Sequence, residues 1–516
     1  MPINRRHFLG ASLTAATAAT TSNAAPSTAA SARKSLYDMG TRRELFLDDF
    51  LVDRTAGSVH FLLHHPVAQE EVIRHTRDWE GTSSGYHTVI QDGDMYRMFY
   101  RGSNFNLVNN QIVTTNRETC CYAESTDGIH WKTPELGLFD HDGSKANNIV
   151  WRGPGSHNFS PFLDQRPECP RTERFKALGG LPSTSRGLLL FTSPDGIHWK
   201  KAREKAVITN GAFDSANIAF WDPTIKKYRA YWRDFTEGLE KAKKGIGKRM
   251  IRTAVSDDMV KWTDEHDLLY TDSPLQQMYT NNVMPYFRAP HLLVGFPMRY
   301  IERGWSPSMR ALPDLENRKV RSDAHLRYGT ALTETQIMAS RDGVTFKRWN
   351  EAFLRPGIQR HDSWYYAHHD VAWNLVTTKS RWKDAPDEIS IYASSGKWHG
   401  PGARMTRFTL RQDGFVSANC PFSGGEIITR PLTFQGSKLE TNFSTSAAGT
   451  MKFEIQTAAG EPIPGFTLDD ADETFGDELD RVVTWKGSPD VSRLAGKPIR
   501  LRITISDGDL YAIKFS

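Results

Sequence analysis

Four short segments repeat one pattern: a serine, an aspartate two residues later and an aromatic residue at the sixth position after the serine. They read Ser125-Thr-Asp-Gly-Ile-His-Trp131, Ser193-Pro-Asp-Gly-Ile-His-Trp199, Ser256-Asp-Asp-Met-Val-Lys-Trp262 and Ser340-Arg-Asp-Gly-Val-Thr-Phe346. In three copies an Asp-Gly pair favours a tight turn with one residue at positive φ, after which the aromatic residue packs between neighbouring units. Recurrence at intervals of roughly 60–85 residues predicts a β-propeller with a central channel.

The chain from Gly85 to about Gly425 divides into five units with the same internal order, each opening with an apolar strand. The first four units contain the repeated turn. The fifth lacks it, so its assignment rests on the strand pattern alone. The units begin at Tyr86, Asn158, Asn217, Asn281 and Trp364.

The sequence pattern of residues 426–516 differs from that of the five units. Short stretches of alternating apolar and polar residues are separated here by Gly, Pro and Asp turns. This pattern predicts a compact β-sandwich. Helical periodicity is nearly absent from the chain. The expected fold class is all-β, with a five-bladed β-propeller over residues 33–425 followed by a small C-terminal β-sandwich. We expect residues 44–53, which precede the first unit, to help close the ring.

The first residues carry an export signal rather than part of the fold. Asn4-Arg-Arg-His-Phe-Leu-Gly10 is followed by a weakly apolar Ala/Thr run and by small residues, the pattern of a twin-arginine signal peptide. We therefore expect residues 1–32 to be removed and the mature protein to act in the periplasm or outside the cell.

Composition narrows the range of partners. A net charge of +5 in 516 residues is too small to indicate nucleic-acid binding. After the N-terminal export signal, no segment is long and apolar enough to span a membrane. The four cysteines, at positions 120, 121, 169 and 420, have neither disulfide nor zinc spacing. His64 and His65 lack a further ligand at metal-binding spacing, so we predict no metal and no other cofactor. The oligomeric state stays open.

Three features together carry a resemblance to a known family. They are the Asp-Gly-x-x-Trp turns, the stretch that runs from Trp131-Lys-Thr-Pro-Glu-Leu-Gly-Leu138 to Asn147-Asn-Ile-Val150, and Gly436-Ser-Lys-Leu-Glu-Thr-Asn-Phe443 near the C-terminus. In these features the chain resembles the five-bladed propeller carbohydrate-active enzymes related to glycoside hydrolase families 32 and 43. The resemblance implies a glycoside hydrolase that cleaves terminal sugars from an extracellular polysaccharide or oligosaccharide by carboxylate acid/base catalysis.

The chain also departs from both families. The catalytic motifs of family 32 are absent. Where family 43 has the aspartate that acts as the general base, this chain has Gly85-Tyr86-His87. No catalytic set therefore transfers directly, and the candidates have to come from the residues themselves.

Glycoside hydrolysis needs two carboxyl groups, one protonated and one ionised. We expect Glu80 and Asp214 to form this acid/base pair, with Glu334 in reserve, because each precedes a strand of the predicted channel. The alternative for each is a loop carboxylate paired with a local arginine. The repeated turn aspartates are excluded from catalysis; they are Asp127, Asp195, Asp258 and Asp342.

Amides, tyrosines, histidines and arginines at the ends of the channel strands suit a hydroxyl-rich ligand. The predicted substrate-binding residues are Tyr86, His87, Arg101, Asn158, Asn217, Arg233, Asn281, Asn282, Arg299, Tyr366 and His368. The alternative is that these polar groups cap strands and bridge loops.

Two other functions fit the same channel. A polysaccharide lyase acting on uronic-acid glycans would use a cation to neutralise the substrate carboxylate and a His or Tyr to move the proton, for which His87, Tyr86 and the arginines are candidates. A non-catalytic glycan-binding propeller would keep the polar lining without a proton-transfer pair. In each case the partner is a polysaccharide or oligosaccharide.

Overall fold

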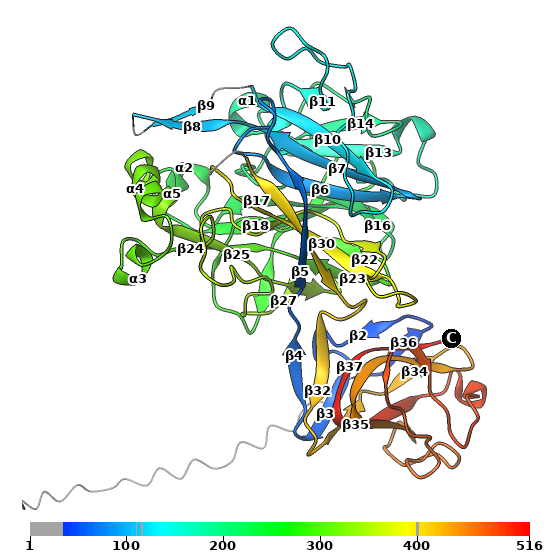
Figure 1. Ribbon diagram of the computed structural model, residues 1–516. Coiled ribbons are helices and arrows are strands. Elements are labelled where there is room, and N and C mark those ends of the chain that lie inside the picture. The colour runs from blue at the N-terminus through cyan, green and yellow to red at the C-terminus, as the bar shows by residue number, and fades with distance from the viewer. Residues whose placement is uncertain (1–34, 110, 115–116, 399–401) are drawn as a thin grey trace, which may run out of the picture.

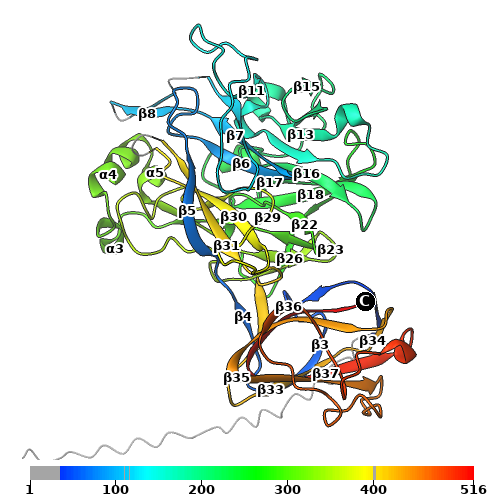
Figure 2. The same cartoon turned by 45° about the vertical axis from the view of Figure 1, so that its right-hand side comes forward.

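The computed structural model describes residues 35–109, 111–114, 117–398 and 402–516. The expected signal peptide, residues 1–32, lies outside the described residues. The described chain consists mostly of strands, in agreement with an all-β fold, and it forms two bodies (Figures 1 and 2). None of the helices among these residues has the length and apolar character needed to traverse a bilayer.

Five sheets of four or five strands make up most of the larger body. The first contains β6 (Gly85–Asp92), β7 (Met95–Gly102), β10 (Thr119–Ser125) and β11 (Ile149–Arg152). The second contains β12 (Ser160–Leu163), β13 (Phe175–Gly179), β14 (Leu189–Ser193) and β15 (Lys200–Lys201). The third contains β16 (Ile218–Asp222), β17 (Lys227–Phe235), β18 (Arg249–Ser256) and β19 (Thr263–Asp267).

The last two sheets are less regular. The fourth contains β20 (Leu269–Thr271), β22 (Met284–Tyr286), β23 (Ala289–Gly295), β26 (Met338–Ser340) and β27 (Thr345–Arg348). Beside it in the chain, a three-stranded sheet contains β21 (Gln277–Met278), β24 (Met298–Glu302) and β25 (Ala331–Thr335). The fifth contains β5 (Val67–Arg74), β28 (Asp370–Val371), β29 (Val376–Thr378), β30 (Glu388–Ser395) and β31 (Arg404–Leu410).

The first strands of the five sheets face one another. A cavity of about 530 Å³ is lined by residues of β6, β12, β16 and β22 and of the segment that joins β28 to β29. Hydrogen bonds also join the fifth sheet to the first, since the Trp373 N–H donates to the His87 carbonyl oxygen at 2.8 Å. The short apolar strands expected to line a channel therefore lie around a common space.

An N-terminal strand completes the fifth sheet. β5 pairs with β31 over Thr409↔Val67 to Arg404↔Arg74, so residues that precede the first sheet in sequence pair with the last. The expectation that residues 44–53 have this role was wrong, because β2 (Glu44–Leu45) pairs with the C-terminal β37 (Ile499–Phe515). Residues 44–53 and β5 both alternate apolar and polar residues as strands do. Only the strand with which each one pairs distinguishes them.

The four repeated motifs are turns between the third and fourth strands of their sheets, as expected. In the second copy, Asp195 Oδ1 accepts hydrogen bonds from the N–H groups of Ile197 (2.9 Å) and His198 (2.8 Å), and Ser193 Oγ accepts one from Gly196 N–H (2.9 Å). The aromatic residue that ends the motif packs on a neighbouring sheet. The ring pairs are Trp131 with Tyr392, Trp199 with Phe99, and Phe346 with Tyr231.

The smaller body is one ten-stranded network that combines both ends of the chain. Its strands are β1 (Tyr37–Gly40), β2, β3 (Val52–Gly57), β4 (His60–Leu63), β32 (Val416–Cys420), β33 (Gly425–Thr429), β34 (Leu432–Phe434), β35 (Leu439–Thr457), β36 (Asp477–Val482) and β37. The expected domain boundaries, 33–425 and 426–516, therefore need correction. Strands β1 to β4 and β32 fill positions in the C-terminal sheet that the C-terminal segment alone would leave as unpaired edges.

Helices are short and lie in connections. They are α1 (Pro182–Ser185), α2 (Leu239–Ala242), α3 (Pro307–Arg310), α4 (Leu315–Ala324) and α5 (Leu326–Thr330). The last three form an insertion between β24 and β25 that the sequence reading did not anticipate. A separate hairpin, β8 (Phe105–Val108) with β9 (Gln111–Thr114), extends next to this insertion (Figure 1).

The turn geometry gives a stability prediction. Asp195→Ala removes the acceptor of two main-chain N–H groups, and we expect the free energy of unfolding to fall by about 1–2 kcal/mol. Asp195→Asn keeps an oxygen at the same place and should lose less stability.

The stability that Asp195 contributes also depends on pH. Although burial opposes ionisation, the hydrogen bonds from His198, Ile197 and Ser193 lower the pKa of Asp195. Its contribution to the free energy of unfolding is therefore present above the unfolded pKa and is lost as the pH falls through the folded pKa. Denaturant melts of both variants at neutral and acid pH test this, and equal losses for Ala and Asn would contradict it.

Candidate functional site

Polar side chains from several sheets meet at the N-terminal ends of the first strands, whereas the cavity described above lies toward their C-terminal ends. They come from the beginning of β6, the short 3-10 helix η1 (Ser156–Asn158) before β12, and the loops before β16, β22 and β28. In that order they are Tyr86, His157, Asp214, Tyr279 and Tyr366.

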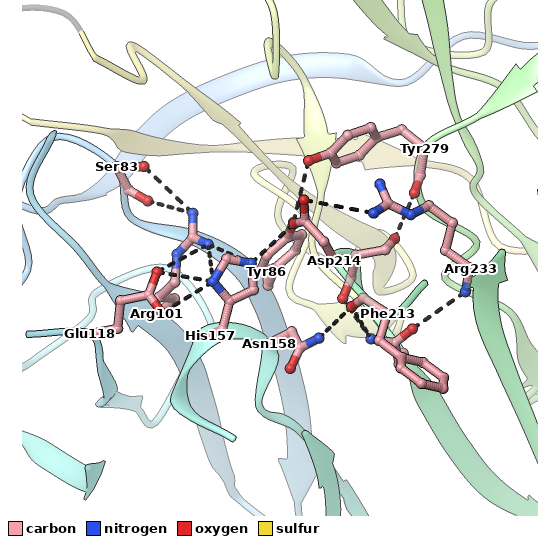
Figure 3. A network of polar contacts seen from close by, with 12 residues as sticks. Ser83, Tyr86, Arg101, Glu118, His157, Asn158, Phe213, Asp214, Arg233 and Tyr279 are labelled. Carbon is pink, nitrogen blue, oxygen red and sulfur yellow. Dashed lines mark hydrogen bonds and ion pairs between the residues drawn. The ribbon is translucent and has the colours of Figure 1, made fainter. Parts of the chain in front are cut away.

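Asp214 is the centre of this group (Figure 3). Its Oδ1 accepts a hydrogen bond from the Tyr86 hydroxyl at 3.1 Å and one from His157 Nε2 at 3.0 Å. Its Oδ2 lies 3.7 Å from a guanidinium nitrogen of Arg233. Desolvation would raise the pKa of Asp214, but His157, Arg233 and Arg101 hold it well below its usual range. The carboxylate is thus ionised, and its side chain is 55% exposed, so a ligand can reach it.

His157 lies between two carboxylates. Its Nδ1 is 2.9 Å from Glu118 Oε1 on the side opposite to Asp214. Burial and the nearby Arg101 oppose protonation, but the hydrogen bonds to Asp214 and Glu118 outweigh them and raise the pKa of His157. An imidazolium held between two carboxylates fixes the direction of the Asp214 carboxylate and stabilises its charge.

Three tyrosine hydroxyls form a chain that ends at Asp214. Tyr366 donates to the Tyr279 hydroxyl at 2.8 Å, and the Tyr279 hydroxyl lies 3.4 Å from that of Tyr86. Burial raises the pKa of each phenol well above its ordinary value. The hydroxyls therefore stay protonated and serve as hydrogen-bond donors.

Arginine side chains lie over the faces of these rings. The guanidinium carbon of Arg101 is 4.9 Å from the Tyr86 ring centroid, and that of Arg233 is 5.4 Å from the Tyr279 centroid. Arg101 also donates to the Ser83 carbonyl oxygen at 3.1 Å. Cations on the ring faces are stabilised by the aromatic quadrupole, so these contacts hold positive charge beside Asp214.

A second carboxyl group at this end has the opposite character to Asp214. Asp370, at the start of β28, is buried, and burial raises its pKa to about 6 although Lys397 and Arg101 oppose the shift. Burial and Arg101 in turn lower the pKa of Lys397 to about 8, and both Asp370 and Asp214 act on this lysine in the other direction. Lys397 thus lies within electrostatic reach of both carboxyl groups.

The backbone is strained at this end of the sheets. Tyr86, Phe213, Asn282, Ala367 and His369 all have φ between 46° and 60°, and each lies at the start of a first strand or within the five residues before it. The left-handed region costs a residue with a side chain of the order of 1 kcal/mol. These five residues show that the backbone near the starts of the first strands is held in a conformation that their residue types do not prefer.

Two predicted residues lie behind the site. The Glu80 carboxylate is buried and accepts a hydrogen bond from the Tyr100 hydroxyl at 2.5 Å. His87 is buried as well, with its Nε2 2.9 Å from that of His75, and burial keeps the pKa of His87 well below its ordinary value. Neither side chain contacts the Asp214 cluster in any hydrogen bond among the described residues. We therefore assign both to the interior of the first sheet rather than to catalysis.

Glu334 and Arg299 pair with each other instead of facing Asp214. They are opposite each other on β24 and β25, and both Arg299 Nε and Nη2 donate to Glu334 Oε1. The neighbouring Tyr300 contacts the Tyr279 and Tyr366 rings. Because successive side chains of a strand point to opposite faces, Arg299 and Glu334 lie on the far face. The alternative of a locally paired carboxylate holds for Glu334.

The four predicted asparagines hold the backbone together. All are fully buried, and each amide nitrogen donates to a main-chain carbonyl oxygen at 2.6–2.9 Å. The acceptors are Phe213 for Asn158 and Asn217, Ala216 for Asn281, and Val371 for Asn282. Three of these bonds join the start of one sheet's first strand to that of the next, so we assign the asparagines a structural role, as in the alternative of polar groups that bridge loops.

His368 is buried against His369, with ring centroids 4.0 Å apart. Its ring nitrogens have no hydrogen-bond partner within the described residues, and burial keeps its pKa well below the ordinary value. His368 therefore belongs to the interior rather than to the predicted sugar-binding residues. No group of three or more His, Cys, Asp or Glu residues arranged to hold a metal occurs within the described residues.

Of the predicted residues, Tyr86, Arg101, Asp214, Arg233 and Tyr366 thus come together. Glu118, His157, Asp370 and Lys397 were missed. His157 and Asp370 carry a usable signal, since each lies within a few residues of the start of a first strand, as Tyr86 and Asp214 do. Glu118 and Lys397 lie next to later strands and carry none.

No protein-family model matches the chain, and no curated protein matches it. Solved structures with a similar chain path include a glycoside hydrolase family 43 arabinoxylan arabinofuranohydrolase from Bacillus subtilis, with 11% identity over 88% of this chain and 99% of that one at a TM-score of 0.40. An N-acetylgalactosamine deacetylase from F. plautii has 12% identity over 68% and 95%, with a TM-score of 0.40. An endo-arabinase from Bacteroides thetaiotaomicron has 11% identity over 68% and 97%, with a TM-score of 0.36. Likenesses this low assign neither a reaction nor a substrate to the chain.

The position of His157 gives a pH prediction. Because its folded pKa is raised, its contribution to stability is complete below the unfolded pKa, about 6.5, and is lost as the pH rises through the folded value. Asp214→Asn removes one of the two carboxylates, so we expect the pKa of His157 to fall in that variant. The stability difference between the two proteins should shrink toward alkaline pH. NMR titration of the ring and thermal melts from acid to alkaline pH measure both effects, and an unchanged ring pKa in Asp214→Asn would contradict the assignment.

Proposed function

We propose that the larger body is a five-bladed β-propeller and that the chain is a carbohydrate-active enzyme. The five first strands around one cavity and the pairing of β5 with β31 support the architecture. In such a ring the N-terminal ends of the first strands form the mouth of the channel, which is where the Asp214 cluster lies. The twin-arginine pattern supports export to the periplasm or the medium.

The reaction that the site supports best is hydrolysis of a glycosidic bond. One observation carries this proposal: two carboxyl groups at the same end have their pKa values driven apart, that of Asp214 downward and that of Asp370 upward to about 6. Such a divergence assigns one carboxyl the ionised role and the other the protonated role. The substrate class is a polysaccharide or oligosaccharide attacked at a terminal sugar.

In the proposed mechanism, Asp370 donates its proton to the oxygen of the leaving group as the glycosidic bond breaks. A water molecule attacks the anomeric carbon from the other side, and its proton passes to Asp214. The tyrosine hydroxyls and Arg233 hold the sugar hydroxyls and keep Asp214 ionised. The hydrolysed sugar then leaves, Asp214 releases its proton to solvent, and Asp370 regains one from solvent.

A second candidate is a lyase acting on uronic-acid glycans. The observation in its favour is the Tyr86 hydroxyl, which has Asp214 as an acceptor at 3.1 Å and Arg101 over its ring. In this reaction Asp214 would take the proton next to a substrate carboxylate neutralised by Arg101, and the protonated Tyr86 hydroxyl would donate its proton to the leaving oxygen. The product distinguishes the two reactions, because elimination leaves an unsaturated sugar and hydrolysis does not.

The first experiment screens the purified protein on neutral and uronate-containing glycans, following reducing ends together with ultraviolet absorbance. We expect reducing ends without new absorbance. On the substrate found, Asp214→Asn and Asp370→Asn should each lower kcat/KM by about 10²–10⁴-fold, the range of a lost acid or base.

Asp234→Asn is the matched control. Asp234 is also a buried aspartate, it follows Arg233 on β17, and it pairs with Arg252 at 3.3 Å on the other face of the sheet. Activity near that of the unsubstituted protein is expected for this variant. New absorbance would favour the lyase, and full activity in both Asp214→Asn and Asp370→Asn would refute the acid/base assignment.

The pH profile gives an independent prediction. If Asp370 acts as the acid, kcat/KM falls as the pH rises through about 6, the pKa of its buried carboxyl. Since Lys397 lowers that pKa, Lys397→Met should move the falling limb to higher pH. Rates measured across the acid to neutral range test this, and a limb that stays in place in Lys397→Met would exclude Asp370 as its origin.

A further inference from the structure

Arg233 is a buried cation whose guanidinium makes no hydrogen bond among the described residues. It is 5% exposed, and the ion-pair contact it makes to Asp214 is 3.7 Å long, beyond hydrogen-bonding range (Figure 3). Its other close neighbours are the rings of Phe235 and Tyr279. Its Nε is buried and unpartnered in this part of the chain. A guanidinium with unused donors faces the half-exposed carboxylate of Asp214.

Lys397 approaches the same place from the fifth sheet. Its Nζ lies 5.9 Å from the centroid of the Tyr86 ring. A Cβ on Gly85 would be 3.4 Å from this nitrogen and 3.8 Å from Arg101 Nη2, so two cationic groups converge over a residue without a side chain. No hydrogen bond or ion pair of Lys397 Nζ occurs within the described residues. Like charges this close repel each other unless an anion lies between or beside them.

Three buried cations elsewhere in the described chain have direct partners. Lys176 Nζ lies 2.7 Å from Asp164 Oδ2, and Arg229 Nε lies 3.1 Å from Asp222 Oδ2. Arg321 Nη2 donates to two main-chain carbonyl oxygens at 2.9 Å, although its Nε and Nη1 have no partner within the described residues. Leaving a buried charge without such partners costs stability, so unused donors at a ligand-accessible site point to a ligand group that completes them.

The charge balance points the same way. Near Asp214 the described cations are Arg101, Arg233, Arg249, Lys397 and the raised-pKa His157, whereas the carboxyl groups are Asp214, Glu118 and Asp370. Of these carboxyl groups, Asp214 Oδ1 and Glu118 are already engaged by His157. The cations therefore outnumber the carboxyl groups, and the two cationic groups without a hydrogen bond among the described residues are those of Arg233 and Lys397.

We propose that the sugar bound over Asp214 carries an acidic group, a uronate carboxylate or a sulfate ester, which Arg233 and Lys397 bind. This rests on the proposed function in that it places a glycan at the same site, and it adds the chemical class of the sugar. Arginine presents paired N–H groups that match the oxygens of a carboxylate or sulfate, and lysine adds a point charge.

Binding of single sugars tests this without any turnover. Calorimetry on the mature protein compares galactose with galacturonate and galactose 6-sulfate, and glucose with glucuronate and glucose 6-sulfate. We expect at least one acidic sugar to bind about tenfold or more tighter than its neutral counterpart, the size of a charge-assisted contact. Preference for the carboxylate or for the sulfate identifies the acidic group, and either supports the proposal.

Variants assign the preference to residues. Arg233→Gln and Lys397→Gln should each reduce the ratio of affinities for acidic over neutral sugar about tenfold, and Arg233→Lys should retain part of it. The matched control is Arg252→Gln, because Arg252 lies on β18 and pairs with Asp234, Glu265 and Asp267 outside the site. Should Arg233→Gln fail to fold, Lys397→Gln decides.

Equal binding of acidic and neutral sugars, absence of binding by any acidic sugar, or an unchanged ratio in both Arg233→Gln and Lys397→Gln would overturn the proposal. These outcomes are independent of the hydrolase assignment, which depends on bond cleavage and on Asp214 and Asp370. A protein that prefers acidic sugars but releases no reducing ends would keep the binding proposal and lose the hydrolase.

Discussion

Hydrogen bonds between neighbouring sheets are the constraint on which the rest of the structure depends. Buried asparagine amides donate to carbonyl oxygens across the sheet boundaries, and the Trp373 indole N–H donates to the Val283 carbonyl oxygen at 2.9 Å. Each bond satisfies backbone groups that a strand end would otherwise leave unpaired. Together they fix the starts of the first strands at one end. The strained residues before these strands persist because this network over-determines them.

Because the strand starts lie together, their polar side chains lie together as well. The local charges and the burial of each group then give these side chains different pKa values. Asp214 lies beside His157 and Arg233 and is kept ionised. Asp370 is buried, and its pKa rises. The same residue type therefore has two different pKa values at one end of the first strands, and the proposed acid and base roles depend on that difference. The positive charge that stabilises Asp214 is also what suits the site to an acidic ligand.

The sequence predicted the repeated turns of the fold better than the pairing of the N-terminal strands. The repeated turn is local, since Asp195 bonds to residues two and three positions away, and a local pattern is visible in a sequence. The partner of β5 is more than 300 residues distant, so alternation alone could not distinguish it from β2. The site follows the same rule. Asp214 and Tyr86 were identified because they precede first strands, whereas Lys397 reaches the site only through the folded arrangement of the fifth sheet.

Glu80 shows why residue type and position together did not suffice. It precedes the first strand as Asp214 precedes the third, yet its carboxylate turns inward to the Tyr100 hydroxyl. Only the packing of the interior decides which of two such acids stays accessible to a ligand.

The most direct test of the account is a carbon-13 NMR titration of the aspartate side-chain carboxyls in the unliganded protein, assigned with single Asp→Asn variants. The account predicts one carboxyl, that of Asp370, titrating near pH 6, while that of Asp214 stays ionised to well below the ordinary range. If both carboxyls titrate together at an ordinary aspartate pKa of about 3.9, the two have no separate acid and base roles and the proposed chemistry fails.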